Sequence, residues 1–186
     1  MKDYIKLSSV LFLISAIACG ILALVNNFTY PIIMENKAKE EEIARKSVLP
    51  QAESFEQKIL GKDSEGNEFY YYVGKNKDNK IIGYTMAVSA PGYSSNPKTM
   101  VGLTADLKIT DIKVIDQAET PGLGANCVND DFPPRFRGKG KDAMKTDKDG
   151  GEIKSITGAT ITTRAITNSI ADGITMLEKS LKKGEE

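Results

Sequence analysis

The stretch that decides the fold is residues 155–181, SITGATITTRAITNSIADGITMLEKSL. Its apolar side chains recur every three to five positions, at Ile161, Ala165, Ile166, Ile170, Ile174, Leu177 and Leu181. Residues at this spacing share one face of an α-helix. The pattern therefore predicts an amphipathic helix of about 20 residues, with one face packed against the rest of the fold.

Upstream of this helix, four runs rich in β-branched and aromatic residues predict two antiparallel strand pairs. The runs are residues 69–73, 81–88, 99–105 and 109–115. Turn-forming residues separate the members of each pair, at 77–79 and at 106–108. Residues 117–149 show little periodicity, and long irregular segments in compact domains are usually functional or mobile. Together these features predict an α+β fold, an antiparallel sheet with flanking helices.

The N-terminal part differs in character from the rest. Residues 7–25, LSSVLFLISAIACGILALV, carry no charge, and the first charge after Lys6 is Glu35. At about 1.5 Å per residue the run matches the roughly 30 Å hydrocarbon core of a bilayer. It is apolar all round, unlike a helix that buries one stripe in a small domain. A cleaved signal peptide stays an alternative, because residues 15–18 resemble a small-residue cleavage site.

We expect an uncleaved transmembrane anchor in residues 1–34, followed by a domain in residues 35–186. Lys2 and Lys6 precede the apolar run, whereas an acidic flank follows it. The positive-inside bias then predicts a single-pass protein of the cytoplasmic membrane, with a cytoplasmic N-terminus and an extracytoplasmic domain.

Composition excludes several chemistries. The chain has 25 Lys+Arg, 25 Asp+Glu, no histidine, and two cysteines, Cys19 and Cys127. Histidine-based triads, Cys₂His₂ zinc sites and iron–sulfur clusters therefore lack their residues. Zero net charge argues against nucleic-acid binding. We expect no metal site and no catalytic side chain, so any redox chemistry requires a cofactor.

The segment Thr157-Gly158-Ala159-Thr160 forms a hydroxyl-rich turn just before the predicted C-terminal helix. Free backbone N–H groups and the positive end of a helix dipole favour a phosphate at such a place. A threonine there, Thr160 or Thr162, could instead cap the helix. The residues alone leave both interpretations open.

Two segments resemble the FMN-binding domain family. Thr157-Gly158-Ala159-Thr160 matches the family's [Ser/Thr]-Gly-Ala-Thr flavinylation motif, with Lys154 standing where Asp is frequent. Residues 119–124, ETPGLG, resemble the family's flavin-contacting loop, and Phe132, Phe136 and Gly138-Lys139 are similar to a further family stretch. The resemblance implies FMN bound covalently, by a phosphoester to Thr160.

The resemblance also implies roles for the neighbouring residues. Thr157, Gly158 and Ala159 belong to the phosphate end, whereas Glu119, Thr120, Leu123 and Gly124 contact the ring. Further candidates are Tyr93 beside the ring, Lys139 as a counter-charge and Ser155 in the phosphate turn.

Within this family the chain is similar to G subunits of the Rnf complex, the ion-translocating ferredoxin:NAD⁺ oxidoreductase. The resemblance implies an electron carrier that is not catalytic alone, with other membrane subunits of the complex as partners. It also implies maturation by a flavin transferase that uses FAD and Mg²⁺. The alternatives are the related C subunit of a Na⁺-translocating NADH:quinone reductase, a stand-alone extracytoplasmic reductase, and a structural or assembly subunit without flavin.

Overall fold

The computed structural model describes residues 2–62 and 68–183. It divides into two compact units, residues 1–40 and 41–186. Helix α1, Lys2–Val48, forms the first unit up to residue 40, and its last turns belong to the second unit. Apolar side chains on every side of α1 are exposed, from Leu7 to Met34. Among the described residues α1 is the one helix long and apolar enough to cross a membrane.

The second unit is built on a five-stranded antiparallel sheet in the order β1-β2-β3-β4-β5. The strands are β1 Ser54–Lys62, β2 Glu68–Lys75, β3 Ile81–Ser89, β4 Lys98–Thr104 and β5 Ile109–Asp116. The α+β class and the four strands expected from the sequence are confirmed. The sequence pattern did not predict β1, because none of the described side chains of this edge strand is buried.

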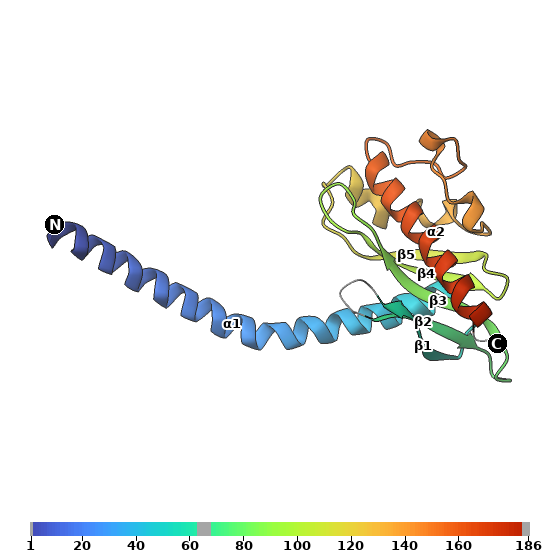
Figure 1. Ribbon diagram of the computed structural model, residues 1–186, viewed down its shortest axis with the longest axis horizontal. Coiled ribbons are helices and arrows are strands. Elements are labelled where there is room, and N and C mark those ends of the chain that lie inside the picture. The colour runs from blue at the N-terminus through green and yellow to red at the C-terminus, as the bar shows by residue number, and fades with distance from the viewer. Residues whose placement is uncertain (1, 63–67, 184–186) are drawn as a thin grey trace. The chain divides into compact units, whose positions relative to one another are not determined.

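Helix α2, Thr160–Lys183, covers one face of the sheet, as Figure 1 shows. Its buried residues Ile166, Ile170, Ile174 and Leu177 join a core with Met86 of β3, Val101 of β4 and other sheet residues. Neighbouring strand residues point to the opposite face. There, Ala44 and Val48 of the last turns of α1 pack with Met100.

Between β5 and α2 the chain runs through an irregular segment with four short 3₁₀ helices. These are η1 Gly124–Val128, η2 Pro133–Arg135, η3 Lys141–Ala143 and η4 Asp147–Asp149. Phe132 and Phe136 anchor this segment, because both are fully buried and their rings meet edge to face at 5.1 Å between centroids. Phe132 and Phe136, which resemble residues of a further stretch in the FMN-binding domain family, are therefore core residues.

Candidate functional site

A cavity of about 520 Å³ opens beside the N-terminal end of α2. We call it the turn cavity, and its lining residues are Tyr93, Glu119, Thr120, Leu123, Gly124, Gly158, Ala159, Thr160, Ile161 and Thr162. Seven of the eight site residues expected from the sequence are among them. The eighth, Thr157, is exposed on the adjoining turn and is not part of the lining. The fold thus brings the 119–124 loop and the 157–160 turn to one cavity.

A tight turn presents Thr160 at the first position of α2. The Ala159 N–H donates to the Ile156 carbonyl at 2.9 Å, and Gly158 has a φ of 75°. Glycine adopts this left-handed conformation without the strain that a Cβ would add. The Thr163 hydroxyl accepts from the Ile156 N–H at 3.1 Å and donates to the Ala159 carbonyl at 3.0 Å. The turn is therefore fixed to the first turn of the helix.

The threonine hydroxyls near this turn have different environments. Thr160 is half-buried, and within the described residues its hydroxyl makes no hydrogen bond. Thr162 is buried and donates its hydroxyl to the Glu119 carboxylate at 2.7 Å. Neither hydroxyl caps the helix, so the capping interpretation is not what the structure shows. A free hydroxyl at the positive end of a helix is well placed for linkage to an anionic group.

Glu119 is a buried carboxylate in the wall of the turn cavity, with 4% of its surface exposed. Its Oε1 accepts from the N–H groups of Ser94 and Ser95, at 3.1 and 2.9 Å, and from the Ser95 hydroxyl at 2.8 Å. Its Oε2 accepts from the Tyr93 N–H at 3.3 Å and from the Thr162 hydroxyl. Glu119 therefore ties the 93–95 loop to the first turn of α2.

These donors control the ionisation of Glu119. Burial raises its pKa, but the hydrogen bonds from Thr162, Ser95 and the backbone of Ser94 outweigh burial and hold the pKa below its ordinary value. The carboxylate is ionised at neutral pH. Since protein donors engage both oxygens, contact between Glu119 and a flavin ring stays a prediction.

The mouth of the turn cavity is apolar. Tyr93, Leu123 and Ile161 are 71%, 43% and 49% exposed. Monomeric domains rarely leave large apolar side chains gathered around a cavity unless they bind something there. The geometry suits a flat, largely apolar ligand that carries a polar end toward Thr160.

The turn is supported from behind by two carboxylates. Asp147 accepts hydrogen bonds from the N–H and hydroxyl of Ser155, at 3.0 and 2.5 Å. Asp149 forms a bidentate ion pair with Arg164, accepting two hydrogen bonds at 2.7 and 2.8 Å. The Arg164 and Thr146 hydrogen bonds lower the pKa of Asp149 to about 2. Ser155 therefore orients the turn and lies outside the cavity lining.

The lysines considered from the sequence also lie outside this lining. Lys139 pairs with Glu152 at 2.5 Å, and the Lys154 carbonyl accepts from Arg135 at 2.8 Å. Among the ten lining residues the one formal charge is the Glu119 carboxylate.

Cys127 lies in η1 and is fully buried. Burial, and secondarily the charge of Glu119, raises the pKa of its thiol to about 11. Both cysteines are free thiols, and the described residues contain no group of His, Cys, Asp or Glu that could hold a metal ion.

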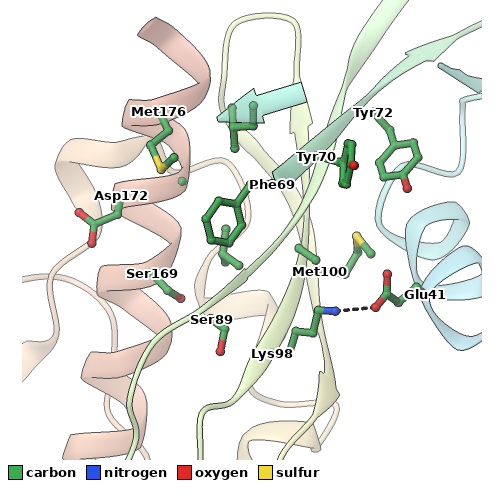
Figure 2. A pocket seen from close by; sticks show the side chains of 14 residues that line it. Glu41, Phe69, Tyr70, Tyr72, Ser89, Lys98, Met100, Ser169, Asp172 and Met176 are labelled. Carbon is green, nitrogen blue, oxygen red and sulfur yellow. Dashed lines mark hydrogen bonds and ion pairs between the residues drawn. The ribbon is translucent and has the colours of Figure 1, made fainter. Parts of the chain in front are cut away.

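A second cavity, of about 430 Å³, lies where β2 and β3 diverge. We call it the strand cavity; Figure 2 shows its labelled lining residues Glu41, Phe69, Tyr70, Tyr72, Ser89, Lys98, Met100, Ser169, Asp172 and Met176. The β2–β3 pairing ends at Tyr71 and Met86, after which β2 follows β1 and β3 follows β4. None of the site residues expected from the sequence lines it.

Three residues in or behind the lining of the turn cavity have roles that the sequence did not predict. Ile161 was assigned to the packed face of α2 but is half-exposed at the cavity mouth. Ser95 and Thr162 hold Glu119, yet they lie 24 and 43 positions from it. No local signal links residues at such separations. The buried face of α2 carries four hydroxyl-bearing residues, Thr162, Thr163, Thr167 and Ser169, and the sequence does not distinguish Thr162 among them.

Known proteins resemble this chain in both sequence and fold. Residues 92–175 match the family described as FMN-binding domain, and this range contains every residue that lines the turn cavity. The G subunit of the Na⁺-translocating ferredoxin:NAD⁺ oxidoreductase complex of Acetobacterium woodii is 36% identical, over 91% of this chain and 89% of the relative. The G subunit of the ion-translocating oxidoreductase complex of Methanosarcina acetivorans is 30% identical, over 93% of this chain and 94% of the relative.

Among solved structures, NqrC of Shewanella oneidensis superimposes with a TM-score of 0.62. The match covers 78% of this chain and 99% of that chain, at 17% identity. At this identity the likeness shows a shared fold.

Proposed function

Because the chain belongs to the family of G subunits of ion-translocating oxidoreductase complexes, we propose that it carries FMN esterified through its phosphate to Thr160 and transfers electrons within an Rnf-type complex. The FMN-binding domain and the G-subunit relatives support a flavin electron-transfer role. The observation that carries the covalent linkage is the Thr160 hydroxyl, which has no hydrogen bond within the described residues and lines a cavity at the N-terminal end of α2.

The residues of the turn cavity fit FMN. The volume of the turn cavity, about 520 Å³, lies within the range of roughly 300–1,000 Å³ that is usual for ligand sites. The exposed apolar rim of Tyr93, Leu123 and Ile161 suits the flat ring system, and the helix N-terminus suits the phosphate. FMN supplies an acceptor and donor of one or two electrons, a capacity that this histidine-free chain lacks in its own side chains.

Attachment requires an activated phosphate. In the proposed reaction the Thr160 Oγ attacks the FMN phosphorus of FAD, the phosphoanhydride bond breaks, and AMP leaves with the bridging oxygen while the hydroxyl proton passes to a base. A flavin transferase with Mg²⁺ would supply this chemistry. Thr160 is then an acceptor that is modified once, and the chain needs no catalytic base of its own.

After attachment the chain's residues hold and shield the group. Thr160 tethers the phosphate, so the cofactor is not diluted into the surrounding medium. Gly158 and Ala159 leave room beside the tether, and the apolar rim excludes water from the ring. Glu119 fixes the 93–95 loop to α2 and so keeps these two walls of the cavity in fixed positions.

We further propose that residues 1–34 anchor the chain in the cytoplasmic membrane and that residues 35–186 form the extracytoplasmic domain. The apolar, exposed surface of α1 and the G-subunit relatives fit membrane association. The described apolar run of α1 contains no Asp, Glu, Lys or Arg. Since ion paths through membranes use such groups, translocation belongs to other subunits of the complex.

The test is covalent labelling of the full-length chain. The protein is produced together with an active flavin transferase, denatured, and examined on a gel for ultraviolet fluorescence and by intact mass. We expect the wild type to fluoresce and to gain the mass of one FMN less water. Thr160→Ala should lose the label, whereas Thr160→Ser should keep it because the acceptor hydroxyl remains.

Thr157→Ala tests the other hydroxyl of the same turn, which is exposed. We expect it to carry the label on Thr160, with a lower yield because Thr157 belongs to the matched motif. A label retained in Thr160→Ala would move the attachment site, and an unlabelled wild type would favour a structural or assembly subunit. Identifying the subunits that copurify with the native chain separates the Rnf-type complex from a quinone reductase or a stand-alone reductase.

A further inference from the structure

The turn cavity has an unusual distribution of charge. One of its ten lining residues is charged, and that charge is the buried carboxylate of Glu119. None of the described residues that line the cavity is Lys or Arg. Any group seated there lies beside a fixed negative charge, with neutral side chains on the remaining walls.

Close packing keeps water away from this carboxylate. A Cβ added at Gly92 would lie 2.7 Å from Oε1 of Glu119, and one added at Gly124 would lie 2.8 Å from Oε2. Only glycine lets both backbone segments approach so closely. Charge–charge effects are larger where water is excluded, because the local dielectric constant is lower.

The hydrogen-bond pattern also commits Glu119 to the ionised form. Five donors from Tyr93, Ser94, Ser95 and Thr162 converge on its two oxygens. A carboxylate is acceptor-only when ionised, and protonation would turn one oxygen into a donor facing other donors. The direction of its pKa shift agrees with this geometry.

We infer that Glu119 is a positioning residue that lowers the reduction potential of the flavin through its fixed charge. The inference rests on the proposed function. Two-electron reduction of FMN takes up two electrons and one or two protons, so the ring gains up to one negative charge. The Glu119 carboxylate repels that charge and favours the oxidised form. The hydrogen-bond donors around it hold it in place and partly neutralise it.

The test compares two variants that change the negative electrostatic potential at the flavin in opposite senses. Glu119→Gln removes the charge at nearly constant shape, whereas Thr162→Val removes one donor and leaves the charge less neutralised. Each is prepared as the full-length, flavin-loaded protein, and its midpoint potential is measured by spectroelectrochemical titration. We expect Glu119→Gln to raise the reduced-to-oxidised ratio at a fixed potential at least tenfold, about 30 mV for a two-electron couple. Thr162→Val should shift the potential downward.

Opposite signs separate charge from mere loosening of the fold, which would move both variants the same way. Equal shifts, or an unchanged potential in a loaded Glu119→Gln protein, would overturn the inference. If Glu119→Gln fails to load, Thr162→Val is compared with Thr162→Ser, which keeps the donor hydroxyl: the valine variant should lower the potential and the serine variant should leave it unchanged, and equal shifts would overturn the inference. A wild-type chain without flavin would be a failure of the proposed function, which the labelling experiment detects independently.

Discussion

The turn cavity and the strand cavity differ little in size, about 520 and 430 Å³, but they differ in how the chain forms them. The strand cavity arises because β2 and β3 part beyond Tyr71 and Met86. The turn cavity arises where a glycine turn, a helix N-terminus and a buried carboxylate meet. One is a gap between paired elements, and the other is held open by its own hydrogen bonds.

The difference shows that cavity volume does not identify a site. The strand cavity has aromatic and methionine walls, and its Lys98 and Glu41 already pair at 2.5 Å (Figure 2). The turn cavity combines an apolar rim with a hydroxyl that has no hydrogen bond within the described residues. Ligand sites typically join an apolar surface to a few placed polar groups, and the turn cavity has that combination.

A pair of glycine variants should separate the two cavities with the largest effect. Alanine at Gly158 must adopt the left-handed conformation, which costs roughly 1–2 kcal/mol, and its Cβ would lie 2.9 Å from Leu123. Alanine at Gly61, beside the strand cavity, would make an ordinary contact of 3.5 Å with Met176. We expect Gly158→Ala to lower covalent flavin labelling about tenfold, and Gly61→Ala to leave it unchanged.

In-gel flavin fluorescence normalised to protein measures both variants, and circular dichroism verifies their folding. Equal labelling of the two variants would mean that the left-handed turn is dispensable for presenting Thr160. Loss of labelling in Gly61→Ala alone would shift attention to the strand cavity.

A smaller effect concerns the ion pair behind the turn. The pKa of Asp149 is lowered from 3.8 to about 2, first by the Arg164 hydrogen bond and then by Thr146. A carboxyl group whose pKa is lower in the folded than in the unfolded state stabilises the fold at a pH above its unfolded-state pKa. That stabilisation is lost as the pH falls through the folded-state pKa. Asp149→Asn should therefore be less stable than wild type at neutral pH, and the difference should disappear as the pH falls from 3.8 toward 2.

Urea unfolding of both proteins in detergent at several pH values measures this difference. Arg164→Gln should show the same pH dependence, because it removes the same pair from the other side. A stability difference that stays constant down to pH 2 would contradict the assignment of the shift to this pair.

The smallest effect is expected at Cys127, the buried thiol of η1. Thiolates react with alkylating reagents, and a thiol with a pKa of about 11 is almost wholly protonated at neutral pH. In a Cys19→Ser background, Cys127 should resist a maleimide in the native state and react fully in denaturant. Rapid native labelling would mean that the packing around η1 opens in solution.

Much of the architecture was predictable because it depends on local periodicity. The three-to-five spacing of Ile166, Ile170 and Leu177 predicted α2, and β-branched runs predicted β2 to β5. The edge strand β1 was not predicted because its sequence, SFEQKILGK, does not alternate apolar and polar residues, and its apolar side chains are at most partly buried. A strand that is held mainly by backbone hydrogen bonds does not need an apolar–polar alternation, so its sequence does not predict it.

Four features can be read from the sequence alone: the apolar run of α1, the amphipathic face of α2, the absence of histidine, and two segments typical of an FMN-binding domain. Those features depend on residues that are near neighbours in the chain. Only the tertiary structure decided that the Thr160 hydroxyl has no hydrogen bond within the described residues, that Thr162 donates to Glu119, and that Ser95 does so from another loop. Hydrogen bonds between distant segments depend on how the sheet and α2 pack, and no local pattern encodes that packing.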